Sequence, residues 1–110
     1  MTNLLTVSIA CGSEAEAQTI AQALVEERLA ACVQSHAITS TYRWQRAIET
    51  APEIMLIAKT RLDKLPALEA RVRQLHSYEV PEILAVPVVW ASAAYTQWLN
   101  ESLARTNDRA

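Results

Sequence analysis

Glycine and cysteine are both scarce in this sequence of 110 residues. With Gly12 as the single glycine, neither G-x-G-x-x-G nor G-x-x-x-x-G-K-[ST] can occur, because each motif needs at least two glycines. The common nucleotide-binding loops are therefore excluded. Cys11 and Cys32 are too far apart for a C-x-x-C zinc or redox motif, and two cysteines do not make a secreted disulfide scaffold. We expect two free thiols.

Excess charge and long apolar runs are also missing. Ten basic residues against 12 acidic ones give a formal charge of -2, which provides no general attraction to nucleic acid or to anionic lipid. An uninterrupted apolar run such as Ile54–Ala58 is far too short to cross a bilayer. The first residues show no basic n-region, long apolar h-region or cleavage pattern, so we expect a cytoplasmic protein.

Hydrophobic periodicity predicts a single α+β domain over residues 1–110, with a frayed end at 105–110. The expected elements are a strand at 5–11, a helix at 13–28, strands at 32–44 and 48–60 around a turn, a helix at 66–76, a strand at 83–89 and a last helix after Ser92. This β-α-β-β-α-β order with an added helix is typical of the ferredoxin-like arrangement, an antiparallel sheet backed by two helices.

Three local signals refine these elements. Ser13 stands three residues before Glu16, which predicts a capping box at the start of the first helix. Pro52 is expected to introduce a bulge, and Pro87 requires either a bulge or the edge of the sheet. Ser92 is suited to cap the last helix.

The two middle strands are longer than the domain that carries them. If regular, 32–44 reaches roughly 43 Å, whereas the helix at 13–28 covers only about 24 Å. The resulting hairpin overhangs, and it carries Tyr42 and Trp44 near its tip. Since a second subunit can satisfy free strand edges and aromatic surface together, we predict an oligomer.

Four motifs occur in order along the chain, at Glu27–Val33, Tyr42–Trp44, Lys59–Thr60 and His76–Ile83. In this order and spacing, from about Thr6 to Leu99, the chain resembles the CutA family, the divalent-cation tolerance proteins. The resemblance implies a homotrimer in which hairpins pack edge to edge around a threefold axis. At the hairpin tip the chain departs from the family's usual W-x-G-K-I, because Arg46 stands at the glycine position.

Two residues are candidate metal ligands. Cys11 precedes a helix N-terminus, where the helix dipole favours a thiolate, although it can equally end a buried stripe of the first strand. His76 ends the second helix, where an imidazole can bind a cation or interact with the last carbonyl groups. The resemblance implies the metal role for both, because the family has its proposed copper-binding cysteine and histidine at these positions.

Glu79 and Glu82 flank Val80-Pro81, and two carboxylates held by a proline can coordinate a divalent ion. Alternatively, one of them forms an ion pair with Lys59 or Arg71. We take Glu79 as the third candidate ligand after Cys11 and His76. Tyr78 supplies a hydroxyl to the same place or packs.

The remaining cysteine and histidine and two of the tryptophans are expected to have structural roles. We assign Cys32 to the core and His36 to the surface or an interface. Trp44 and Trp98 are expected to be packing anchors.

The favoured function is a cytoplasmic, homotrimeric, copper-binding or divalent-cation-binding protein involved in metal tolerance, as the resemblance implies. The alternative is a trimer similar to the PII-like regulators, which senses small molecules or acts as a scaffold, with Lys59, Glu79 and Glu82 facing a cleft. No nucleophile has a base at a recognisable spacing, so we expect no enzymatic activity. We expect neither nucleic acid nor membrane as partners.

Overall fold

The computed structural model describes residues 2–104 of the chain. Its elements are β1 (Leu4–Cys11), α1 (Glu14–Glu26), β2 (Cys32–Trp44), β3 (Ala47–Arg61), the 3₁₀ turn η1 (Leu62–Lys64), α2 (Leu65–Leu75), β4 (Ile83–Pro87) and α3 (Ala93–Leu103). The predicted order of strands and helices is confirmed. The expected frayed end at 105–110 lies outside the described residues.

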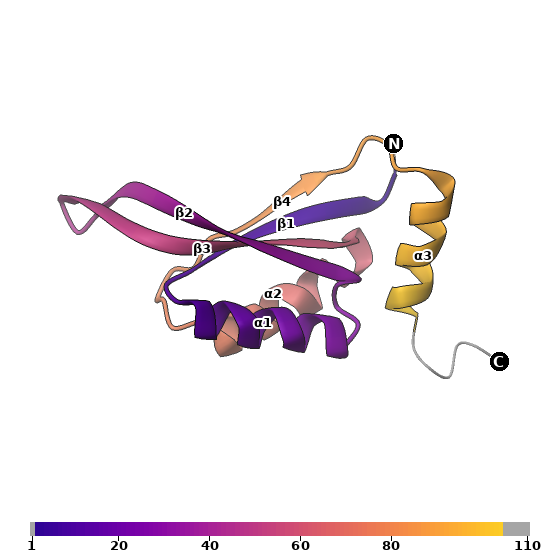
Figure 1. The fold of residues 1–110 in the computed structure, drawn as a ribbon, viewed down its shortest axis with the longest axis horizontal. Coiled ribbons are helices and arrows are strands. Elements are labelled where there is room, and N and C mark those ends of the chain that lie inside the picture. The colour runs from indigo at the N-terminus through magenta and orange to yellow at the C-terminus, as the bar shows by residue number, and fades with distance from the viewer. Residues whose placement is uncertain (1, 105–110) are drawn as a thin grey trace.

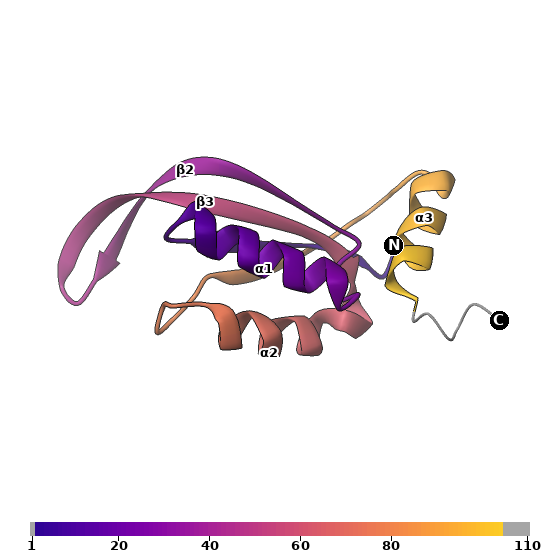
Figure 2. The same cartoon turned by 60° about the horizontal axis from the view of Figure 1, so that its bottom comes forward.

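The four strands form one sheet in the order β2-β3-β1-β4, and every neighbouring pair is antiparallel. Helices α1 and α2 lie side by side against one face of this sheet, while α3 stands at the end where β1 begins (Figures 1 and 2). The α+β class is therefore correct. Neither α1 nor α2 covers the opposite face, where Leu84 and Val86 of β4 remain 55% and 49% exposed.

Alternation along β1 creates the core. Val7, Ile9 and Cys11 point toward the helices, as expected of a strand whose successive side chains face opposite sides. They pack with fully buried residues of α1, β3 and α2, namely Ile20, Leu24, Leu56, Leu68 and Val72. The last residue of this buried stripe, Cys11, is thus held where the core meets the end of the sheet.

Helix α1 ends earlier than its apolar pattern predicts. The pattern continues to Leu29, but the helix stops at Glu26, and Arg28 has a φ of 58°. The Leu29 amide donates back to the Leu24 carbonyl at 2.9 Å, so the reversal satisfies a free carbonyl at the helix end. The Arg28 side chain then donates to the Ser102 carbonyl at 2.8 Å, which ties the end of α1 to α3.

The two prolines of the sheet are accommodated at open edges. The bulge expected at Pro52 does not form, because β2 and β3 stay in one-to-one register through the pair Thr39↔Pro52. Pairing of β3 with β1 stops at Ile54, so one side of β3 is an open edge at Pro52 and can lack an N–H there. Pro87 ends the edge strand β4, two residues before the predicted end at Val89.

Beyond the last β1 partner, β2 and β3 continue as a two-stranded ribbon that projects from the rest of the domain (Figure 1). The longest axis of the molecule measures 53 Å. At the tip, Trp44 pairs with Ala47, and the two residues between them have positive φ values, 47° at Gln45 and 71° at Arg46. A two-residue hairpin loop favours this geometry because it matches the strand twist, but Arg46 adopts it without being a glycine.

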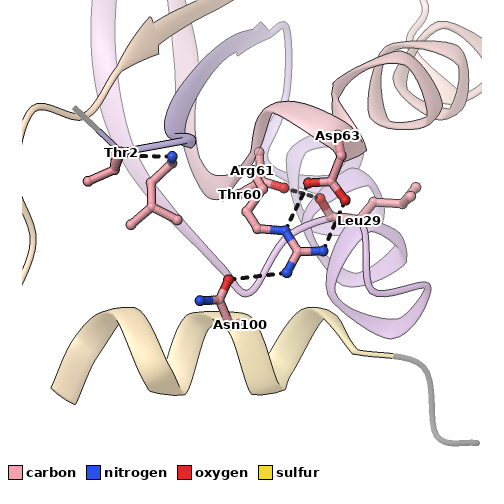
Figure 3. A network of polar contacts seen from close by, with 7 residues as sticks. Thr2, Leu29, Thr60, Arg61, Asp63 and Asn100 are labelled. Carbon is pink, nitrogen blue, oxygen red and sulfur yellow. Dashed lines mark hydrogen bonds and ion pairs between the residues drawn. The ribbon is translucent and has the colours of Figure 1, made fainter. Parts of the chain in front are cut away.

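Polar contacts hold α3 against the end of β3 (Figure 3). The Arg61 guanidinium donates to both carboxylate oxygens of Asp63, at 2.8 and 3.0 Å, and to the Asn100 side chain at 3.1 Å. The hydrogen bond from Arg61 is the main cause that lowers the pKa of Asp63. Nearby, the buried hydroxyl of Thr60 donates to the Leu29 carbonyl at 2.7 Å. These contacts lie at the opposite end of the sheet from Cys11.

Candidate functional site

The end of β1 and the segment after α2 meet at one edge of the domain. Cys11 is the last residue of β1, and His76 caps the C-terminus of α2. Both side chains are fully buried. The structure therefore brings together Cys11 and His76, the first two candidate metal ligands predicted from the sequence.

The imidazole of His76 is hydrogen-bonded at both nitrogens. Its Nε2 lies 2.7 Å from the Ala10 carbonyl oxygen, which can only accept, so Nε2 carries the proton and donates. Its Nδ1 accepts from the Tyr78 amide at 3.1 Å. These two bonds define a neutral tautomer that links β1 to the loop leading into β4.

Glu16 joins this cluster from the first turn of α1. The capping box is only half formed: Ser13 Oγ accepts from the Glu16 amide at 3.2 Å, as predicted. The Glu16 carboxylate instead turns toward the α2 end, where Oε1 accepts from the Ser77 amide at 3.0 Å. Its Oε2 lies 3.6 Å from His76 Nδ1 and is buried without a hydrogen-bond partner among the described residues.

Cys11 Sγ, a Glu16 carboxylate oxygen and a His76 ring nitrogen all lie within 4.8 Å of one another. Burial raises the pKa of the Cys11 thiol from 9.0 to about 11, and the nearby charges of Glu16 and Glu53 add to the effect. The thiol is therefore neutral near pH 7. A sulfur, a nitrogen and an otherwise unpartnered carboxylate oxygen form a donor set that fits a divalent transition metal, provided that the thiol gives up its proton.

Glu79 does not belong to this cluster. It is exposed in the loop before β4 and lines a cavity together with Glu82. Neither basic residue considered as its ion-pair partner contacts it: Arg71 pairs with Glu27 at 2.9 Å, and Lys59 donates to Gln34 at 2.8 Å. Lys59 lines a separate cavity beside α3, so the predicted grouping of Lys59 with the two glutamates is not formed in one subunit.

The cavity that contains Glu79 has a volume of about 580 Å³ and lies beside the overhanging ribbon. Its walls come from β1, from the tip half of β2, from β3 and from the loop before β4. They consist of Ala10, Ser40, Thr41, Tyr42, Trp44, Glu53, Tyr78, Glu79, Val80 and Glu82. We call this space the acidic pocket, because three glutamates and no basic residue of the described chain line it.

Three residues of this region have roles that the sequence did not predict. Glu53 and Gly12 were not predicted to belong to a site, and Tyr78 was left with two alternative roles. Glu53, only 7% exposed, accepts a hydrogen bond from the Tyr78 hydroxyl at 2.7 Å. The Tyr78 ring also packs against the imidazole of His76, with 4.7 Å between ring centroids. Gly12 makes room for the phenol, since a Cβ built there would lie 2.8 Å from the Tyr78 hydroxyl oxygen. The lone glycine directly after Cys11 was the signal for this close approach.

Burial raises the pKa of Tyr78, and the hydrogen bond to Glu53 raises it further. The phenol therefore remains protonated and donates its proton to the carboxylate over the whole physiological range. Tyr78 thus has two contacts of different kinds. Its amide donates to His76 in the Cys11–Glu16–His76 cluster, and its hydroxyl donates to Glu53 in the acidic pocket.

The remaining candidates differ in how far they are buried. Cys32 is half-buried rather than a core residue, and His36 is exposed, as expected, on the edge strand β2. Trp44 and Trp98 retain 42% and 45% exposure, so the subunit alone does not bury either predicted anchor. Trp98 contacts Tyr95 within α3, with 5.4 Å between ring centroids.

Residues 5–102 match the model of the family described as "CutA1 divalent ion tolerance protein". The chain belongs to this family. It is 47% identical over 97 residues to the divalent-cation tolerance protein CutA of Thermus thermophilus, covering 87% of this chain and 94% of that protein. Its match to the human protein CutA, at 41% identity, covers 91% of this chain but 56% of the human protein.

Solved CutA structures share the fold. The chain superposes on CutA from Archaeoglobus fulgidus, named a periplasmic protein, with a TM-score of 0.90 at 35% identity, covering 92% of this chain and 99% of that one. CutA from Synechococcus elongatus in complex with a Bis-Tris molecule gives a TM-score of 0.87 at 38% identity, with coverage of 93% and 95%. Within residues 2–104, no helix is both long and apolar enough to cross a bilayer.

Proposed function

We propose that the protein binds a divalent cation, copper foremost, through the Cys11–Glu16–His76 cluster and contributes to divalent-cation tolerance. The observation that carries the proposal is the buried convergence of a thiol, an imidazole and an unpartnered carboxylate oxygen within 4.8 Å. The family name supports the metal class. Thiolate and imidazole favour copper over magnesium or calcium.

In this proposal Glu16 replaces Glu79 as the third ligand. Glu16 Oε2 already lies beside His76 Nδ1, whereas Glu79 is exposed and outside the cluster. For His76 to ligate through Nδ1, the nitrogen has to give up the hydrogen bond from the Tyr78 amide. A metal role for Glu79 itself stays a prediction.

Metal binding here is expected to release protons. The Cys11 thiol, with its pKa of about 11, must deprotonate before it can ligate, so the apparent affinity for Cu(II) rises with pH below that value. Calorimetric titration with Cu(II) at pH 6.5 and pH 8, in buffers of different ionisation enthalpy, measures the number of protons released. Affinity that does not change with pH would contradict ligation by this thiol.

The ligand assignment is tested by Cu(II) titration of Cys11→Ser, Glu16→Gln and His76→Ala. We expect each to weaken binding by at least about tenfold, because each removes a ligand or its charge. Glu14→Gln is the matched control, since Glu14 is another first-turn glutamate of α1 and is exposed. Unchanged affinity in a Cys11→Ser, His76→Ala double variant that still folds would refute the site.

We further propose that the active form is a cytoplasmic homotrimer of ferredoxin-like subunits without enzymatic activity. The strand order supports the subunit fold. Exposed Leu84 and Val86 on the uncovered sheet face, and the open edges of the projecting ribbon, support a subunit that is completed by others. Sedimentation equilibrium at micromolar concentration is expected to show a trimer, and a stable monomer there would contradict the proposal.

A second candidate function is small-molecule sensing by a PII-like trimer. The specific observation in its favour is the solved complex of the Synechococcus relative with Bis-Tris, an organic molecule rather than a metal. A thermal-shift screen of metals against metabolites separates the two functions, since only a ligand that binds the folded state raises the melting temperature. Stabilisation by metals alone would count against this candidate.

A further inference from the structure

We infer that the acidic pocket is a binding site for a small organic cation, such as a quaternary or protonated amine that carries a hydroxyl group. The inference is independent of the metal site and gives the small-molecule function a ligand class. It depends on three properties of the pocket. These are a largely buried carboxylate with one oxygen open to the pocket, aromatic walls, and the lack of any basic side chain among the described residues that line it.

The buried carboxylate is that of Glu53. An ionised carboxylate at 7% exposure is costly unless its oxygens are paired or hydrogen-bonded. One oxygen accepts from the neutral Tyr78 hydroxyl, whereas the other has no hydrogen bond to the described residues and is not among their fully buried unpartnered atoms, so it remains open to a ligand in the pocket. No Lys or Arg of the described chain forms an ion pair with Glu53. A cation in the pocket supplies the missing opposite charge.

The walls select an organic cation over a hard metal ion. Tyr42 and Trp44, each 42% exposed, line the pocket from β2, and Tyr78 lines it from the loop before β4. Aromatic faces attract cations through their quadrupole, and the attraction is strongest for weakly hydrated ones such as quaternary ammonium groups. A strongly hydrated Mg²⁺ ion keeps most of its water and gains little from such walls.

The other side chains of the pocket suit the same ligand. Glu79 and Glu82 are exposed and add two negative charges in the loop before β4, which attracts a cation from solution. The hydroxyl-bearing residue Ser40 lies on the same face of β2 as Tyr42 and Trp44 and is placed to bond a polar substituent of the ligand. A volume of about 580 Å³ is ample for an amine of choline size.

The test uses choline and its uncharged isostere 3,3-dimethylbutan-1-ol as probes of the full chain, in phosphate buffer free of other amines. Three tryptophans give site-resolved signals, because only Trp44 lines the acidic pocket, whereas Trp90 and Trp98 lie near α3. In ¹H–¹⁵N spectra we expect choline to shift the Trp44 indole signal saturably and to leave those of Trp90 and Trp98 in place. The alcohol should bind at least about tenfold more weakly, since it lacks the charge.

Two variants complete the test. Glu53→Gln keeps an acceptor for the Tyr78 hydroxyl but removes the charge, and it should weaken choline binding at least about tenfold. Glu49→Gln is the matched control, an exposed glutamate of β3 outside the pocket, and should leave the affinity unchanged.

Equal binding of choline and the alcohol would overturn the inference. So would a shift of Trp90 or Trp98 in place of Trp44, equal competition by Mg²⁺, or no effect of Glu53→Gln. A lack of choline binding by the intact protein would also overturn it. Cu(II) titration of the same variants keeps the outcomes separate, since Glu53→Gln retains all three proposed metal ligands.

Discussion

Two polar clusters, the Cys11–Glu16–His76 cluster and the acidic pocket, lie on opposite faces of the sheet at the end of β1. They differ in how far they are buried and in how completely their polar atoms are hydrogen-bonded. The Cys11–Glu16–His76 cluster is buried on the helix side, and both ring nitrogens of His76 and one oxygen of Glu16 already have hydrogen-bond partners. The acidic pocket opens to solvent and leaves a buried carboxylate with a single neutral donor. Since successive residues of a strand face opposite sides, Cys11 belongs to the buried cluster and Ala10 lines the acidic pocket.

The difference shows that the first cluster also supports the fold, whereas the loop side of the acidic pocket does not. In the first cluster, the His76 ring joins β1 to the loop before β4, so its removal disrupts the contact between these two segments. In the acidic pocket, the glutamates of the loop carry no structural contact of this kind. Stability experiments should therefore respond to the first cluster more strongly than to the second.

The largest expected effect comes from His76→Ala. It leaves the Ala10 carbonyl and the Tyr78 amide without partners in a buried setting, so we expect a loss of about 2–4 kcal/mol in the free energy of unfolding. Urea denaturation without metal measures it. His36→Ala, at an exposed position, is the control and should change stability by less than about 0.5 kcal/mol. Equal effects of the two would show that His76 has no supporting role.

The next effect is a loss of stability at alkaline pH. Between the ordinary thiol pKa of 9.0 and the value of about 11 in the fold, unfolded chains have lost the Cys11 proton while folded ones keep it. Folded molecules then bind more protons, so the contribution of this thiol is complete below pH 9 and is lost as the pH rises toward 11. The expected loss is about 2 kcal/mol. Urea denaturation at pH 8 and pH 10.5 should show a loss that is larger in the wild type than in Cys11→Ala, which keeps only the smaller alkaline effect of Tyr78 and Tyr95, whose pKa values are also raised.

Gly12→Ala probes the border between the two clusters. The added methyl group approaches the Tyr78 hydroxyl to 2.8 Å, so the phenol has to move away from Glu53. We expect a loss of about 1–2 kcal/mol. In a double-mutant cycle with Tyr78→Phe, the two losses should overlap by at least about 0.5 kcal/mol, because both act on the same hydrogen bond. Strict additivity would mean that the methyl group is accommodated without moving the phenol.

The smallest effect is a gain. Arg46 has a φ of 71° at the tip of the ribbon, a conformation that costs an L-residue with a side chain more than it costs glycine. Arg46→Gly should raise the free energy of unfolding by about 0.5–1 kcal/mol. Arg43→Gly, placed within β2, is the opposite control and should lower it. Because the tip lies apart from the first cluster, Cu(II) affinity should not change in either variant.

Local patterns were enough to predict most of the fold. The bounds of β2 and the cap of α3 by Ser92 follow from alternation and from a serine at the right offset, both of which act within a few residues. The end of α1 was placed too late, because the apolar stripe continues to Leu29 after the backbone has already reversed at Arg28. Hydrophobic periodicity indicates which residues are buried. Because residues that follow a helix can also be buried, periodicity alone does not locate the end of the helix.

The site was harder to predict, since its contacts join residues distant in sequence. A glutamate three residues after a serine suits a capping box, but Glu16 bonds the Ser77 amide instead, and only the folded chain places these two groups together. Likewise, Glu53 and Tyr78 are 25 positions apart and meet beside Gly12. Cys11 and His76 were identified through the family resemblance, and the structure adds Glu16 to them.

The double attachment of Tyr78 has a thermodynamic consequence. Its amide bonds His76 Nδ1, its hydroxyl bonds Glu53, and a cation that takes Nδ1 must displace the amide and thereby disturb the hydroxyl. Two ligands that compete for one residue in this way are linked, and the factor by which the first weakens the second equals the factor by which the second weakens the first. Copper bound at the Cys11–Glu16–His76 cluster would then lower the affinity of the acidic pocket for an amine.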